Sequence, residues 1–174
     1  NPEIPPNIDI GEYMQHLKGP DFPTGATIHG IDGIRDMYET GHGRFHVRSQ
    51  CEVHDDGGGK RIVITEIPYQ VKKAAMLEGI ADLVSKETLK GIRDIRDESS
   101  KEGIRVVIEL RKGTEPETIR RQLYKFTNIE SSFGFNTLAI VNNKPKILNL
   151  KEFISEFLKF RENTVIKRVK FDLK

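Results

Sequence analysis

Little in this sequence points to the secretory pathway or to a membrane. It holds a single cysteine, Cys51, and no tryptophan among its 174 residues. One cysteine cannot form a disulfide within the chain, which fits a reducing compartment. No apolar run approaches the ~18 residues of a membrane-spanning helix, and no signal peptide opens the chain. We therefore expect a protein with no membrane partner.

The chain also lacks a large excess of charge of either sign. Its formal net charge is +2, although 31% of its residues are charged and 36% are hydrophobic. This composition is typical of a soluble globular domain with a large surface. Because the net charge is small, binding to a polyanion depends on where the basic residues gather.

The hydrophobic patterns predict an α+β fold. Strands are expected at 44–53, 61–67, 92–96, 104–110, 137–141 and 146–148, and helices at 71–89, from 114 past 126, and from 149 to 174. This order favours a mostly antiparallel sheet with helices packed on one face, followed by a long C-terminal helix. We divide the chain into a proline-rich connector (1–43), an α+β domain (44–148) and a helical arm (149–174).

Short-range signals define the ends of several elements. Helices are predicted to end at Gly41 and, with a C-cap, at Gly91. Capping boxes at Thr114 and Glu117, and at Asn149 and Glu152, are predicted to begin two helices. Turns are predicted at 55–60 and at Asn142 and Asn143. Pro116 falls in the first turn of its helix, where proline is tolerated.

The strand at 44–53 alternates between an apolar face and a basic face. Phe45, Val47, Ser49, Cys51 and Val53 share the first; the basic side chains Arg44, His46 and Arg48 lie on the second, with Arg35 and His42 nearby in sequence. Taken alone, this pattern fits a solvated strand face as well as it fits a surface that contacts phosphates.

A rigid loop precedes that strand. Residues 19–30 contain two prolines and three glycines and carry one large aliphatic side chain, Ile28. An apolar side chain held out on such a loop suits insertion between DNA base steps. The pattern alone favours an ordinary, partly buried isoleucine.

Other candidate sites have simpler explanations. The histidines have no partners at the spacing of metal ligands, so we assign no metal. Gly57-Gly58-Gly59-Lys60 is followed by Arg61 and a strand, whereas a phosphate-binding loop needs Ser or Thr and a helix. Cys51 lies on the apolar strand face and is expected to be a buried thiol. Asp94, Asp97 and Glu98 stand beside basic residues and are expected to form surface ion pairs.

Several strings resemble the A subunits of bacterial DNA gyrase, which are type IIA DNA topoisomerases. They occur in the family's order along nearly the whole chain and include 19–30, Glu39-Thr40-Gly41-His42-Gly43-Arg44, Thr65-Glu66-Ile67-Pro68-Tyr69-Gln70-Val71, Arg96-Asp97-Glu98-Ser99, Arg105-Val106-Val107-Ile108-Glu109, Ser132-Phe133-Gly134-Phe135-Asn136 and Pro145–Glu152. The resemblance implies a "tower" domain at 44–148 and the start of a coiled coil at 149–174.

The resemblance also implies DNA-binding residues. Ile28 would insert into the gate duplex beside the cleavage site, with Thr27 next to it. Arg35, His42, Arg44, His46 and Arg48 would contact phosphates of that duplex. Two positions depart from the family: Thr27 stands where an aliphatic residue is more common, and His42 stands where arginine is usual. His42 therefore lacks the charged fork of an arginine.

The resemblance implies an enzyme whose catalytic part is missing from this chain. The nucleophilic tyrosine of the family stands between Arg and Thr on a winged-helix domain, and Tyr13, Tyr38, Tyr69 and Tyr124 have other neighbours. We expect that domain to precede Asn1, so this chain alone has no catalytic residue and no cofactor. Mg²⁺ and ATP would bind the partner B subunit. The complete enzyme would hold a homodimer of A subunits with B subunits, act on double-stranded DNA, and lie in the bacterial cytoplasm or in an organelle.

Three alternatives remain open from the sequence. The chain could be part of the topoisomerase IV counterpart, which shares the same organisation. It could be a non-catalytic nucleic-acid-binding α+β module, which would need exposed aromatic side chains for base stacking. It could also be a structural connector whose basic face is incidental.

Overall fold

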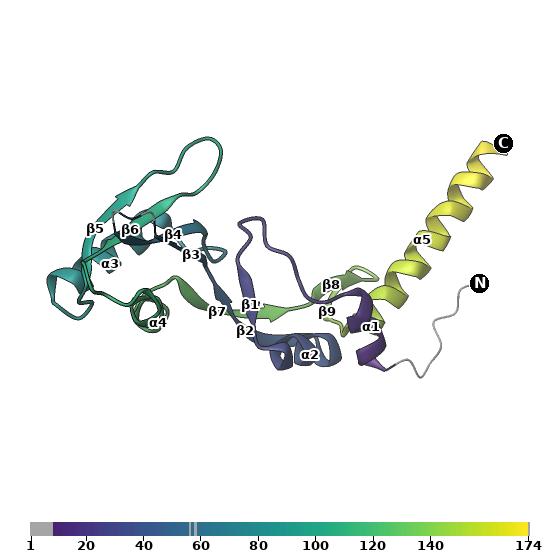
Figure 1. The fold of residues 1–174 in the computed structure, drawn as a ribbon. Coiled ribbons are helices and arrows are strands. Elements are labelled where there is room, and N and C mark those ends of the chain that lie inside the picture. The colour runs from purple at the N-terminus through teal and green to yellow at the C-terminus, as the bar shows by residue number, and fades with distance from the viewer. Residues whose placement is uncertain (1–8, 56, 58, 174) are drawn as a thin grey trace. The chain divides into compact units, whose positions relative to one another are not determined.

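The computed structural model describes residues 9–173 apart from residues 56 and 58 (Figure 1). The described residues fall into two compact units. The first joins residues 9–20, 30–45 and 133–173, and the second joins residues 21–29 and 46–132. The domain boundaries expected at 43 and 148 stay a prediction. Residues 1–8 of the expected connector, the turn residues Asp56 and Gly58, and Lys174 lie outside the described residues.

The first unit is mainly helical. Its elements are α1 (Ile10–His16), α2 (Ile31–Thr40), β8 (Leu138–Val141), β9 (Lys144–Ile147) and α5 (Leu150–Asp172), with the start of β2 (His42–Arg48) and the end of β7 (Glu130–Asn136). α2 buries Ile34, Met37 and Tyr38 and ends at Gly41, whose φ of 80° suits glycine. The predicted helix end at Gly41 is confirmed.

The second unit is built on a sheet. Its elements are β1 (Thr27–His29), β3 (Gln50–Asp55), β4 (Lys60–Glu66), α3 (Lys73–Ser85), β5 (Ile92–Asp97), β6 (Val106–Leu110) and α4 (Pro116–Phe126), with the remaining parts of β2 and β7. β3, β4, β6 and β5 pair in that order, each antiparallel to its neighbour. Figure 1 shows these strands in blue and teal, with α3 and α4 beside them.

The main core of the second unit lies between this sheet and its two helices. Ile62 and Ile108 from the sheet pack in one cluster with Ile80 of α3 and with Ile119 and Leu123 of α4. All five are at most 2% exposed. The α+β class, the antiparallel pairing and the long C-terminal helix are confirmed. Within the described residues the strands are divided over three sheets instead of one.

The strand expected at 44–53 is two strands. β2 pairs with β1 and β7, whereas β3 pairs with β4 in the four-stranded sheet. The break falls at Ser49, whose backbone N–H donates to the carbonyl of Ile129 at 2.8 Å. The chain leaves the β1–β2–β7 sheet at this bond and enters the four-stranded sheet as β3. The expected apolar face holds through Cys51 but is wrong at Val53, which is 40% exposed.

Two strands were not predicted. β1 is only three residues long and follows the Pro- and Gly-rich loop. β7 has the sequence ESSFGFN, whose serines, glycine and asparagine have low strand propensity. It forms because it pairs with β2 and because Phe133 stacks on the buried Phe45, with the ring centroids 5.9 Å apart.

Two predicted helix ends are wrong. α3 ends at Ser85, and Gly91 lies instead at the start of β5 with φ of 97°. Glu87 supplies the left-handed residue after α3, with φ of 55°. The capping box at Thr114 is absent: the N-cap is Glu115, with no side-chain bond, and the Thr114 hydroxyl donates to the Gly91 carbonyl at 3.4 Å. Phe126, expected in the apolar stripe of α4, is 45% exposed.

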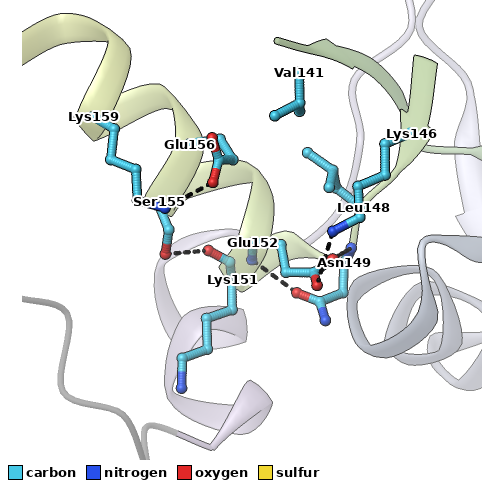
Figure 2. Close-up of a pocket in the computed structure, with 9 residues that line it drawn as sticks. All are labelled: Val141, Lys146, Leu148, Asn149, Lys151, Glu152, Ser155, Glu156 and Lys159. Atoms are coloured by element: carbon cyan, nitrogen blue, oxygen red, sulfur yellow. Dashed lines mark hydrogen bonds and ion pairs between the residues drawn. The ribbon is translucent and has the colours of Figure 1, made fainter. Parts of the chain in front are cut away.

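The C-terminal helix α5 begins as predicted. The side chain of Asn149 accepts from the backbone of Glu152 at 2.8 Å, and the Glu152 carboxylate accepts from the backbone of Asn149 at 3.2 Å. Figure 2 shows this capping box beside the β8–β9 hairpin. None of the described residues of α5 is buried. The predicted turn at Asn142 and Asn143 is confirmed, since Val141 pairs with Lys144.

Candidate nucleic-acid interface

In the second unit, β1 and the end of β2 place the predicted residues on two faces. Thr27 pairs with Arg48, Ile28 with Val47, and His29 with His46. Directly paired residues share a face of an antiparallel pair. One face therefore carries Thr27, His29, His46 and Arg48, and we call it the β1–β2 face. Ile28 lies on the opposite face with Val47; it is half-buried, whereas Val47 is 1% exposed.

A carboxylate that the sequence did not reveal lies on the β1–β2 face. Glu130, from β7, accepts a hydrogen bond from Nε of Arg48, and its other oxygen lies 3.4 Å from Nδ1 of His46. The Arg48 guanidinium also lies 5.0 Å from the centre of the Tyr124 ring. These contacts hold Arg48 in place and offset much of its charge.

His29 adds little charge to this face. Its Nδ1 lies 3.3 Å from Nη1 of Arg48. Burial and the positive charge of Arg48, in that order, lower the pKa of His29 below its usual value of 6.5. This shift favours the uncharged ring, whose Nδ1 accepts a hydrogen bond from Arg48 in the tautomer that is protonated at Nε2.

The first unit holds the other predicted residues, Arg35, His42 and Arg44. Arg35 lies on α2, and the other two lie on β2. All three are exposed. Within the part of the chain that the structure describes, Arg35 and Arg44 form no ion pair, and Nδ1 of His42 lies 2.7 Å from Oδ1 of Asn136. The two arginines are therefore available to an anion.

Two glycines set the contact between α2 and β2. A Cβ on Gly33 would lie 2.0 Å from the carbonyl oxygen of Arg44. A Cβ on Gly43 would lie 2.4 Å from the carbonyl oxygen of Gly33. Both distances are far below any real contact, so only glycine allows the helix to approach the strand this closely. This approach fixes the backbone of Arg44 against α2.

The loop before Ile28 is held by Glu66, at the end of β4. Its carboxylate accepts from the backbone N–H of Ala26 at 2.5 Å. Gly25 and Ala26 both have positive φ, at 69° and 75°. Phe22 stacks on Tyr69 in the same region, with centroids 5.6 Å apart. Sequence reasoning missed Glu66, because nothing local marks a strand-end glutamate as the partner of a distant loop.

The alternative sites behave as expected where the structure tests them. Asp55 pairs with Lys60, so the predicted hairpin is confirmed in place of a phosphate-binding loop. Cys51 is buried, and burial raises the pKa of its thiol. The acidic residues near position 97 form surface ion pairs, as expected. Oδ2 of Asp97 lies 2.7 Å from Nζ of Lys73, and Oε1 of Glu98 lies 3.6 Å from Nε of Arg96.

No described helix combines the length and apolar character needed to span a bilayer. Across residues 9–55, 57 and 59–173, no three His, Cys, Asp or Glu side chains gather as metal ligands would. A hollow between the β8–β9 hairpin and α5, drawn in Figure 2, is lined partly by internal ion pairs. Nζ of Lys146 lies 3.6 Å from Oε1 of Glu152, and Nζ of Lys159 lies 2.8 Å from Oε1 of Glu156.

Comparison with known proteins identifies the family. Residues 4–174 match the DNA gyrase/topoisomerase IV A-subunit family. Relatives named as the A subunits of DNA gyrase include those of Clostridium acetobutylicum, 48% identical over 169 residues, Neisseria gonorrhoeae, 47% over 172 residues, and Staphylococcus aureus strain MRSA252, 46% over 171 residues. Each match covers 97% of this chain but only 19–20% of the relative, so the chain spans about one fifth of the relatives' length. The chain belongs to the family of DNA gyrase and topoisomerase IV A subunits.

Proposed function

We propose that this chain is part of the DNA breakage–reunion subunit of an ATP-dependent type II topoisomerase, and that it binds and bends the gate duplex. The relatives above are named as gyrase proteins, which favours gyrase over topoisomerase IV. Topoisomerase IV remains the alternative within the same family.

One observation carries this proposal beyond family membership. Arg35 and Arg44 are exposed and, within the described residues, have no carboxylate partner. An arginine in this state can contact a phosphate without first losing an ion pair. Such contacts bind DNA independently of sequence and weaken as salt rises. We propose that His42 in the first unit, and Thr27, His46 and Arg48 in the second, also contact the duplex.

Ile28 is the proposed wedge. It lies half-buried on the edge strand β1, on the face opposite to Thr27, His46 and Arg48, so the duplex would reach it around the edge of the sheet. The loop before it is held by Glu66. An apolar side chain inserted between base steps costs a few kcal/mol in lost stacking, which contacts with the bent duplex repay. A rigid support suits this role because the side chain must hold its position against the base stack.

The catalytic step is assigned to residues outside this chain. Burial is the largest of the causes that raise the pKa of Tyr124 to about 12, which opposes its use as a nucleophile. We propose that this chain alone does not cleave DNA, that Mg²⁺ and ATP belong to the B subunit, and that two A subunits pair in the complete enzyme. In that enzyme the chain would act in the cytoplasm.

A base-stacking module is a weaker candidate. Such modules bind nucleic acid with exposed aromatic rings on a sheet. Here Phe45 is 1% exposed, and Phe133 is half-buried with its ring stacked on Phe45. These rings are used in internal packing.

The proposal predicts that Ile28→Ala reduces DNA bending. The bend angle can be measured by energy transfer between dyes at the two ends of a duplex bound to this chain. We expect less transfer with Ile28→Ala, and transfer close to wild type with the conservative Ile28→Leu. Ile140→Ala is the matched control, since Ile140 is 79% exposed on β8. A wild-type chain that leaves the duplex straight, or Ile28→Ala bending it fully, would contradict the wedge role.

A further inference from the structure

The second unit has a surface hollow beside α4 that the proposed function does not use. Two carboxylates, the ring of Tyr124 and four basic side chains line it; the basic side chains are Arg48, Arg120, Arg121 and Lys125. We call this the α4 hollow. Four cations around one hollow repel one another, so the charge balance there requires an explanation.

The two carboxylates of the α4 hollow are already in use. Nη2 of Arg120 lies 2.7 Å from Oε2 of Glu117, one turn earlier on α4. Glu130 accepts from Arg48. Each of these carboxylates offsets one arginine, so the remaining two basic residues, Arg121 and Lys125, leave the hollow with an excess of positive charge.

Arg121 and Lys125 are neighbours on the exposed side of α4. They stand four residues apart, a spacing at which like charges destabilise a helix. Neither forms an ion pair among the described residues, and Nζ of Lys125 lies 5.3 Å from the Phe126 ring. Ile119 and Leu123, on the other side of α4, are buried. This burial fixes the rotation of the helix and keeps the two cations at the surface.

The α4 hollow continues the β1–β2 face within the second unit. Arg48 lines the hollow and also pairs with Thr27 on that face. An isolated small anion would need only the hollow. A DNA strand carries a phosphate about every 3.4 Å along the helix axis and could contact the β1–β2 face and the hollow together.

We propose that Arg121 and Lys125 bind the phosphodiester backbone of duplex DNA, as a second contact for the duplex that lies on the β1–β2 face. This inference rests on the proposed function and adds α4 to its DNA-binding surface. The contact is independent of base sequence, because both side chains meet phosphates.

The first test compares salt dependence. Binding of the full chain to a mixed-sequence duplex is measured by fluorescence anisotropy over a salt series. Loss of two phosphate contacts should make the slope of log affinity against log salt shallower by about 1.8 in Arg121→Ala/Lys125→Ala. Arg121→Lys/Lys125→Arg keeps both charges and should retain the wild-type slope. A wild-type slope in the alanine variant would overturn the proposal.

A second measurement locates the contact. Duplex DNA should protect Lys125 from acetylation, whereas inorganic phosphate at the same ionic strength should not. Equal protection by inorganic phosphate would show a small-anion site and overturn the assignment to duplex DNA, and so would no protection by the duplex. If Arg35→Ala/Arg44→Ala weakens binding while Arg121→Ala/Lys125→Ala does not, the α4 contact fails and the proposed function stands. If the wild-type chain binds no duplex, both fail.

Discussion

Two groups of arginines in this chain are both exposed to solvent but have different neighbours. Arg35 and Arg44, in the first unit, have no carboxylate partner within the described residues. In the second unit each arginine of the other group has a carboxylate partner. Nη2 of Arg96 lies 2.5 Å from Oε1 of Glu109, and Nε of Arg93 lies 3.9 Å from Oε2 of the same residue. Nε of Arg105 lies 3.1 Å from Oε2 of Glu98. Because a net charge of +2 averages over both groups, it hides the difference between them.

The pairing decides what each arginine can do. An exposed ion pair stabilises the fold by only about 0–1 kcal/mol, but its arginine must give up a carboxylate before it can bind a phosphate. An unpaired arginine loses only water. The comparison shows why counting basic residues along a strand does not by itself locate a DNA-binding surface.

The largest expected effect comes from breaking the support of the unpaired group. Gly33→Ala would place a Cβ 2.0 Å from the carbonyl oxygen of Arg44, so α2 and β2 must separate. We expect a loss of about 3 kcal/mol in stability and weaker DNA binding, measured by thermal unfolding and anisotropy. Gly79→Ala is the control, since Gly79 in α3 has no atom within 4 Å of an added Cβ. That change should stabilise by about 0.5–1 kcal/mol. Wild-type stability in Gly33→Ala would disprove the close approach.

A smaller effect is expected when a carboxylate is removed beside Arg48 and, in a second variant, beside the paired arginines. Glu130→Gln frees Arg48 on the β1–β2 face and should tighten duplex binding about two- to fivefold, which corresponds to the loss of one partly buried ion pair worth about 0.4–1 kcal/mol. Glu109→Gln makes the same change beside Arg93 and Arg96, outside the proposed DNA-binding surface, and should leave affinity unchanged. Equal tightening in both variants would show that charge alone, and not position, controls binding.

The smallest effect concerns pH and the ion pair between Lys73 and Asp97, which lies on β5 with the paired Arg93 and Arg96. Hydrogen bonds from Lys73 and then from Ser99 lower the pKa of Asp97 from 3.8 to about 2. A carboxyl with a lowered pKa stabilises the fold above its unfolded pKa, and this contribution is lost as pH falls through the folded value. The stability difference between wild type and Asp97→Asn should therefore be constant above about pH 5 and shrink between about pH 4 and pH 2. The free energy of unfolding is measured with urea for both proteins. If the difference between them does not change from about pH 4 to about pH 2, the Lys73–Asp97 pair is not the source of that difference.

Local signals predicted much of the fold. The capping box at Asn149, the turn at Asn142 and Asn143, and the helix end at Gly41 each depend on residues close in sequence, and all three are confirmed. The capping box at Thr114 failed because its hydroxyl bonds to Gly91, which is distant in sequence. The strand at 44–53 was divided for the same reason, since the break at Ser49 depends on Ile129.

The candidate site shows the same limit. Alternation placed Arg44, His46 and Arg48 together on one side of a strand, but it gave no sign of Glu130, which lies on a strand of low propensity. Ile28 was identified from its loop, whereas its pairing with Val47 and the bond between Ala26 and Glu66 are contacts between segments far apart in the chain. Charges can be read from a sequence, but their partners depend on the fold.

The most direct test of the central claim compares two double variants that remove the same charge. Arg35→Ala/Arg44→Ala acts on the unpaired group, and Arg93→Ala/Arg105→Ala acts on the paired group. Affinity for one duplex is measured over a salt series for both. We predict that the first variant makes the log–log salt slope shallower by about 1.8, as expected for two lost phosphate contacts, and that the second keeps the wild-type slope. Equal slopes in the two variants would contradict the account.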